Sequence, residues 1–329
     1  MVRKWAASGR CTSLEADRST GSSYGHETMT PPSLGNVLYR LVAEARRSLF
    51  DQGELAQLTY GAFDVVAGNL SQSEDNTIEV SFPIGYSADK TPLLGKKVYV
   101  KSDLLGRYQH LAFQQLPVNG IVQLVTIMEA LLSDVVRAVV SRYPQKIGAK
   151  RAVQLQVILE ARSIEEVHRR AADALLNELS YKSPSEFAEA LKDLLSINLL
   201  ESPSFHKYVE LKASRDVHIH SRGVANDTYV RKAGSHARAR SGHHLVVDVH
   251  YFLESYEACL QLMDWLEVEL HSRWHSSEME AFQSRQYQQP GKEALPASSD
   301  QSNEGQSSQK AEADAHGAAS EGQRSGGHL

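Results

Sequence analysis

The spacing of apolar residues predicts helices along most of the chain between residues 33 and 275. After Ser33, a favourable helix N-cap, apolar side chains recur at helical spacing from Leu34 to Phe50. A wide apolar stripe then runs from Val118 to Val139 and ends at Tyr143-Pro144, because a residue before proline is biased out of the α region. Further helices are expected at about 164–179, behind Ser163 with Glu166 at capping-box spacing, and at 183–195, where Pro184 takes the first helical position. Two more are expected at 204–219 and 245–270.

Two short strands interrupt the helical pattern. Ile78, Val80 and Phe82 alternate with polar residues and stop at Pro83. A second alternating run, 97–101, follows the turn-prone segment around residue 95. Period-two alternation bounded by turn residues is typical of strands, and these two are close enough in sequence to pair antiparallel.

Composition divides the chain into four segments. Residues 1–32 and 276–329 are dominated by Ser, Gly, Gln and charge, and too few apolar groups are present to offset the entropy of ordering them. We expect both to be disordered tails, the second of them acidic. Between them lie a small α+β N-terminal module at 33–117 and a helical bundle at 118–275. The expected fold class is therefore mainly α.

Charge and cysteine content exclude several classes of protein. The chain has 35 basic and 40 acidic residues, a formal net charge of −5 and two cysteines, so a disulfide framework or a thiolate zinc site is not expected. No stretch approaches the roughly 20 apolar residues of a membrane helix, and the N-terminus lacks the apolar core of a signal peptide. These features favour a cytoplasmic protein without a membrane partner. Phosphate-binding P-loops, dinucleotide-binding glycine motifs and serine-esterase elbows are absent from the sequence.

The densest chemistry lies between residues 212 and 230. Arg215, Asp216, His218 and His220 fall within six residues at the end of a predicted helix, and Gly223 follows where a left-handed cap is expected. An arginine can hold a phosphate, and a histidine titrating near neutrality can move a proton to or from a ribose hydroxyl. These groups suffice for RNA cleavage by internal transesterification without any cofactor.

Helix geometry leaves two interpretations of this segment open. Arg215 and His220 lie about 140° apart on an ideal helix, whereas Asp216 and His220 share a face. Arg215 and His220 would converge only if the last turn distorts or if two chains bring their helix ends together. Alternatively, His220 and Arg222 simply meet the negative end of the helix dipole and Asp216 pairs with one of them.

Basic residues surround this segment and suggest a surface for a nucleic-acid backbone. The candidate substrate-binding residues are Arg222, Tyr229, Arg231 and Lys232, and Arg238 and Arg240 lie nearby. Tyr229 is the one nearby aromatic residue on which a base could stack. A solvated loop face explains the same charges equally well.

Two further features have a functional and a structural interpretation. Histidines 218, 220, 236, 243, 244 and 250 invite a metal site, but no carboxylate stands at a familiar ligand spacing from them, so no metal is expected. Glu129 and Asp134, on the long helix after Val118, are candidate supports of the active site or ordinary partners of Arg137 and other charges.

The run from Arg215 to His220, followed by Ser-Arg-Gly and Tyr229, resembles the signature of the HEPN superfamily. The segment from Glu129 to Asp134, ending at Arg142-Tyr-Pro, is similar to the E-x-x-L-x-D helix of a HEPN group of uncharacterised bacterial proteins. The connection over residues 179–187 also looks like that group. The resemblance covers roughly residues 118–270.

This resemblance implies an up-down bundle of four or five helices that forms a homodimer. In catalytic members, R-x4-H motifs meet at the dimer cleft and cleave RNA without metal, often in toxin–antitoxin or defence systems, with an antitoxin or other regulatory partner. Carried over, Arg215 would position the phosphate, His220 would be the general acid or base, and Asp216 would orient it, with Glu129, Asp134 and His218 in support. The alternatives are a non-catalytic homodimer that binds RNA or a protein, and a purely structural helical protein.

Overall fold

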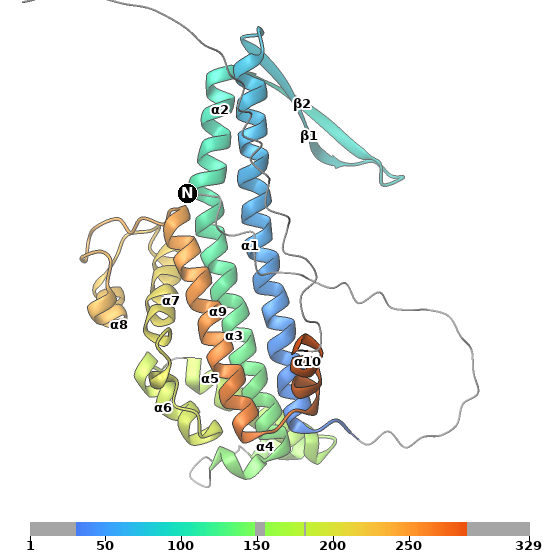
Figure 1. Cartoon of the computed structure of the whole chain (residues 1–329), viewed down its shortest axis with the longest axis vertical. Helices are drawn as coiled ribbons and strands as arrows, with labels where there is room; N and C mark the ends of the chain where they lie inside the picture. Colours follow the sequence, from blue (N-terminus) through green and yellow to red (C-terminus); the bar gives the residue numbers. More distant parts are fainter. Residues whose placement is uncertain (1–30, 149–154, 181, 288–329) are drawn as a thin grey trace, which may run out of the picture. The chain divides into compact units, whose positions relative to one another are not determined.

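The computed structural model describes residues 31–148, 155–180 and 182–287, and this part of the chain is mainly helical with one small antiparallel sheet (Figure 1). The longest helix, α1 (Leu34–Gln72), begins where the sequence predicts it. The hydroxyl of Ser33 accepts a hydrogen bond from the Asn36 N–H at 3.2 Å, which satisfies one of the unpaired donors at the helix start.

The predicted strands are confirmed as an antiparallel hairpin of β1 (Thr77–Tyr86) and β2 (Pro92–Val100). Ile78 faces Tyr99 and Glu79 faces Val98 across the ladder. β1 extends beyond Pro83, where the sequence predicts its end, with an irregularity between Pro83 and Gly85. A two-stranded sheet consists of edges only, and an edge tolerates a proline because the missing N–H can face away from the partner strand.

A continuous helical run follows the hairpin. It comprises α2 (Lys101–His110), a π-helical turn η1 (Leu111–Gln115) and α3 (Leu116–Arg142), and Tyr143 ends it before Pro144 as predicted. Figure 1 shows α1 and this run side by side, with the hairpin joining their ends. The expected boundary between the N-terminal module and the helical bundle, at residues 117 and 118, falls inside α3. The described residues up to Gln283 belong to one compact unit.

Shorter helices complete the fold. At the start of α5 (Ile164–Ser180), the Glu166 N–H donates to the hydroxyl of the predicted cap, Ser163. At the start of α6 (Pro184–Leu195), Pro184 takes the first helical position as predicted, and Ser183 and Glu186 form a capping box. The remaining elements are η2 (Pro144–Ile147), α4 (Leu155–Glu160), η3 (Leu199–Glu201), α7 (Phe205–His220), α8 (Asp227–Ala233), η4 (Gly234–His236), α9 (Val249–Arg273) and α10 (Ser277–Tyr287).

Two predicted boundaries differ from the structure. α9 begins at Val249 instead of Leu245, because Asp248 caps it by accepting the Tyr251 N–H at 2.9 Å, and Leu245 is buried in the preceding loop. Residues 277–287, which we placed in the acidic tail, form α10, and the Met279 side chain is buried. Of the two expected tails, residues 1–30 and 288–329 lie outside the described residues.

The main core lies around α3, whose apolar positions are buried against α1, α5, α6, α7 and α9. Its largest fully buried side chains include Leu38, Ile121, Met128, Leu191 and Phe252. A second, smaller core joins α7, α8 and the loop before α9, and consists of Ala213, Val217, Ala225, Tyr229, Ala233 and Leu245. This smaller core positions the charged segment singled out above. Within the described ranges, no helix combines the length and apolar character needed to cross a membrane.

Candidate functional site

The end of α7 is regular up to His220. The Ser221 N–H donates to the Val217 carbonyl at 2.8 Å, and the Gly223 N–H reaches the same carbonyl at 3.2 Å. Gly223 has a φ of +80°, as its predicted role as a left-handed cap requires, and Arg222 also has a positive φ of +51°. Because the last turn is not distorted, Arg215 and His220 stay on different faces of the helix.

Arg215 is held by two carboxylates. Its Nη2 lies 2.7 Å from Glu129 Oε2 on α3, and its Nη1 lies 3.4 Å from Asp216 Oδ1. The side chain is 17% exposed, and its buried Nε has no hydrogen-bond partner among the described residues. Glu129 also binds Lys212 Nζ, at 2.8 Å. The structure therefore brings Glu129 to Arg215, as the sequence analysis considered.

Asp216 links this cluster to α8. Its Oδ2 lies 3.2 Å from Lys232 Nζ, so the candidate phosphate-binding lysine is already paired with a carboxylate. Together the group contains three cations, Lys212, Arg215 and Lys232, and two carboxylates, Glu129 and Asp216. One positive charge is therefore left over on a partly exposed surface.

Three candidate residues are exposed around the helix end. His220 is exposed and forms no hydrogen bond or ion pair within the part of the chain that the structure describes. Arg222 is exposed as well, and the side chain of exposed Arg231 has, within the described ranges, one contact of 3.4 Å from Nη2 to the Thr228 hydroxyl. These side chains are accessible to a ligand, in contrast to Arg215.

Tyr229 does not offer the stacking surface that we expected. It is only 2% exposed, its hydroxyl donates to Glu210 Oε1 at 2.8 Å, and it accepts the Arg238 N–H at 2.9 Å. Burial is the largest cause that raises the pKa of Tyr229, so the hydroxyl stays protonated. Tyr229 therefore belongs to the smaller core, although basic residues flank it in the sequence.

Sequence reasoning missed the buried charge network around Glu210. This carboxylate accepts hydrogen bonds from the hydroxyls of Ser214 at 2.6 Å and Tyr251 at 2.7 Å, and from Arg238 Nε at 3.2 Å. The Arg238 guanidinium lies over the Tyr251 ring, 3.3 Å from its centroid. Arg238 therefore has a structural role. The local signal was the spacing of Glu210, Ser214 and Val217, which places a polar pair on a buried face of α7.

His218 and Asp134 have structural partners. His218 Nε2 lies 3.0 Å from the Leu245 carbonyl, and its ring packs edge-on against His244. Asp134 pairs with Arg137 at 2.9 Å, and Arg137 also binds Asp173 on α5. Asp134 therefore fits the alternative of an ordinary ion-pair partner, and no described contact joins it to Arg215.

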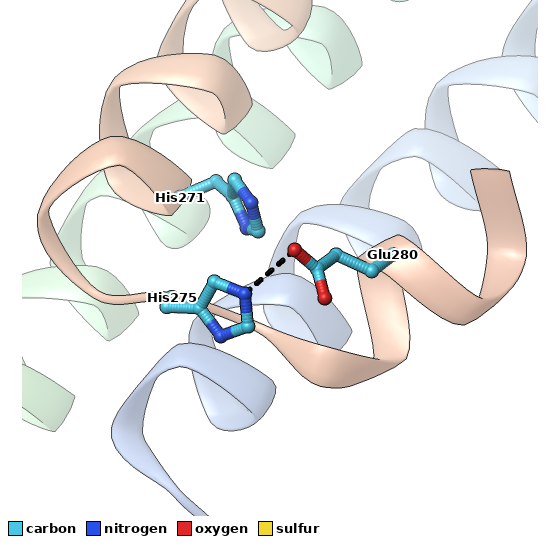
Figure 2. Close-up of side chains that lie close together, drawn as sticks. All are labelled: His271, His275 and Glu280. Atoms are coloured by element: carbon cyan, nitrogen blue, oxygen red, sulfur yellow. Dashed lines mark ion pairs between the residues drawn. The ribbon is translucent and has the colours of Figure 1, made fainter. Parts of the chain in front are cut away.

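Among the described residues, one group of histidine and glutamate side chains could hold a metal ion, and it lies at the C-terminal end of α9. His271, His275 and Glu280 bring one ligand atom each within 4.8 Å of one another (Figure 2). None of the histidines that the sequence analysis weighed as ligands belongs to this group.

Comparisons with known proteins found no match: no family model, no curated protein and no solved structure matches the chain. The comparisons therefore lend no support to a HEPN relationship, which stays a prediction from the residues quoted above.

Proposed function

We propose that the chain is an endoribonuclease that cleaves RNA by attack of the ribose 2′-hydroxyl on the neighbouring phosphate, with residues of α7 as its catalytic groups. One observation carries the proposal. The last turn of α7 presents His220 exposed and unpaired within the described residues, on the same helix as the Arg215 cluster with its excess positive charge. The reaction needs an accessible imidazole and a cation at the phosphate.

A second copy of the chain would complete the site. Because α7 stays regular, Arg215 and His220 of one chain face different directions, and a partner's helix end supplies the missing group. Exposed apolar side chains lie in the same segments and would be covered in such a dimer: Ile219, Val224 and Val246.

Each group then has a defined task. His220 of one copy takes the 2′-hydroxyl proton while that oxygen bonds to phosphorus. The bond from phosphorus to the 5′-oxygen breaks, and the leaving oxygen takes a proton from water. Arg215 of the other copy exchanges a carboxylate partner for the phosphate and stabilises its charge. In the structure Asp216 binds Arg215 and Lys232 and makes no described contact with His220, so it would orient the imidazole only on exchanging Lys232 for His220. The products are a 2′,3′-cyclic phosphate and a 5′-hydroxyl.

The test is incubation of labelled mixed-sequence RNA in EDTA with the wild type, Arg215→Ala, His220→Ala and the control His243→Ala. The His243 side chain is exposed in a neighbouring loop, and its one hydrogen bond among the described residues joins Nδ1 to the Ser241 carbonyl at 3.3 Å. We expect the first two substitutions to slow cleavage by about 10²-fold or more and the control to leave it unchanged. Equal cleavage by all four proteins would refute the proposal.

A mixing experiment tests the shared site. Arg215→Ala and His220→Ala chains are mixed, exchanged by mild denaturation and refolding, and assayed together. Each heterodimer regains one intact site, so the mixture should recover about one quarter of the wild-type activity. No recovery, from a mixture shown to contain heterodimers, would exclude a site built from two copies.

A binding role without turnover is the second candidate. The observation that favours it is the 2.7 Å pair of Arg215 with Glu129, which holds the guanidinium away from solvent. A homodimer of this kind would retain RNA through Arg222 and Arg231 on its surface. In the same assay it would shift RNA on a gel and release no products.

A further inference from the structure

Two histidines and a glutamate converge where α9 ends and α10 begins (Figure 2). His271 lies in the last turn of α9, His275 follows the end of that helix, and Glu280 lies in the first turns of α10. The two imidazole rings are 5.1 Å apart between centroids, and His275 Nε2 lies 2.7 Å from Glu280 Oε1. Three side chains from one short stretch of chain thus point toward a common point.

Helix α1 holds the turn that carries these ligands. A Cβ on Gly35 would come within 2.0 Å of the His275 carbonyl oxygen, so the two backbones are in direct contact. Asn36 Oδ1 accepts hydrogen bonds from the Ser276 hydroxyl at 2.9 Å and from the Glu278 N–H at 3.3 Å. Arg40 Nε also donates to Glu278 at 2.9 Å. The backbone that carries His275 and leads to Glu280 is therefore held in place by α1.

We propose that His271, His275 and Glu280 bind a zinc ion that ties α10 to the end of α9. Two imidazoles and a carboxylate form a donor set that suits zinc, with bonds of about 2.0–2.2 Å and a fourth position left to water. This site is independent of the proposed RNA cleavage, because it uses other residues at the far end of α9 from Tyr251.

The ligand atoms need only small movements to reach the metal. In a tetrahedral zinc site they lie about 3.4 Å apart, whereas here they lie within 4.8 Å. The side chains of His275 and Glu280 are 63% and 56% exposed, so both can rotate without disturbing the core. Their mutual ion pair is exposed and stabilises little, so zinc can displace it at small cost.

The hydrogen bond of His271 provides a specific spectroscopic signal. His271 Nδ1 accepts the Ser276 N–H at 3.2 Å, so the ring proton of the neutral imidazole sits on Nε2. Zinc bound at Nδ1 displaces this hydrogen bond directly. Zinc bound at Nε2 moves the ring proton to Nδ1, which then cannot accept the bond. Either mode leaves the Ser276 amide without its partner, and its NMR resonance should shift.

Calorimetric titration of the full chain with zinc chloride, after removal of chelators, tests the site. We expect a one-to-one binding event whose affinity falls at least tenfold in His271→Ala, His275→Ala and Glu280→Gln. The matched control is His250→Ala, since His250 is on the same helix, its side chain is 80% exposed, and its one ion pair with a described residue is to Glu254. The control should bind zinc like the wild type.

Two further measurements keep the outcome decisive. Urea unfolding without zinc should give the same midpoint for wild type and Glu280→Gln, which shows that lost affinity is not lost folding. Zinc should shift the Ser276 amide in the wild type and not in His275→Ala. Undiminished zinc affinity in the three variants, an unmoved Ser276 amide, or no zinc binding by the wild type would each overturn the proposal, whatever the result of the RNA assay.

Discussion

The carboxylate of Glu210 accepts a hydrogen bond from the Tyr251 hydroxyl at 2.7 Å, which joins the middle of α7 to the first turn of α9 inside the protein. Glu210 is 5% exposed and Tyr251 is 8% exposed. Burial raises the pKa of Tyr251 well above its ordinary value of 10.0, and the nearby Glu210 charge adds to this, so the hydroxyl remains a donor. The guanidinium of Arg238 compensates the Glu210 charge. The pair anchors the loop that follows the candidate catalytic helix.

Removal of the Glu210 carboxylate should destabilise the fold strongly. Glu210→Ala leaves Arg238 as a partly buried cation without its partner and two tyrosine hydroxyls without their acceptor. We expect a loss of about 3–5 kcal/mol in the free energy of unfolding, measured by urea denaturation. Glu254→Ala, which removes an exposed carboxylate of α9, should change it by less than about 0.5 kcal/mol. Similar losses in both variants would contradict a network of this strength.

Under the proposed RNA cleavage, Glu129→Gln should separate binding from turnover. The substitution removes a negative charge beside Lys212 and Arg215, so RNA should bind severalfold more tightly. Arg215 loses the group that positions it, so cleavage at saturating RNA should slow by about tenfold or more. Gel shifts and single-turnover kinetics measure the two effects. Asp134→Asn removes an α3 carboxylate that pairs with Arg137 instead, and should change neither. Binding and turnover that change in the same direction would oppose this role of Glu129.

Gly223→Ala should destabilise the end of α7 for two separable reasons. The residue has a φ of +80°, and a Cβ there would lie 2.9 Å from His244 Cε1 and 3.2 Å from His218 Cε1. Gly242→Ala is the matched control, because its φ is +83° and nothing lies within 4 Å of the new Cβ. We expect a loss of about 1–2 kcal/mol for the control and a larger loss at Gly223, measured by chemical denaturation. Equal losses would mean that His218 and His244 move aside for the new Cβ without a cost in stability.

Local signals predicted the helices and their caps, because those signals act over a few residues. Ser33 and Ser163 cap helices where the sequence places them. The predicted start of α9 was wrong because the apolar residues from Leu245 onward have the spacing of a helical stripe, whereas the helix begins at Val249. Leu245 is buried by the smaller core while lying in a loop, and periodicity alone cannot separate these cases. Asp248 was the correct local signal.

The candidate site could be predicted only as a set of residues, because its contacts are long-range. Arg215 and Glu129 are 86 positions apart, and no local pattern states that their side chains meet. Tyr229 shows the opposite error, since an aromatic residue among basic ones fits a ligand surface as well as a core. The only local signal of Glu210 was its helical spacing to Ser214, and its importance arises from partners on α8, α9 and the loop between them.

His218 should make stability depend on pH near neutrality. Burial, the largest cause, and the charges of His244 and Arg238 lower its pKa below the ordinary 6.5, while its hydrogen bond to Leu245 acts in the opposite direction. Because a carbonyl can only accept, Nε2 carries the hydrogen that binds the Leu245 oxygen at 3.0 Å in the neutral form.

The sign of this pH dependence follows from proton linkage. The unfolded chain binds a proton at His218 more readily than the folded chain. The free energy of unfolding should therefore fall as pH drops below about 6.5, continue to fall through the lower folded-state pKa, and level off beneath it. His218→Gln, whose amide can still donate to Leu245, should lose this component, whereas His250→Gln should keep it. Urea denaturation between about pH 5 and pH 8 measures the difference, and a slope unchanged by His218→Gln would assign the effect to another group.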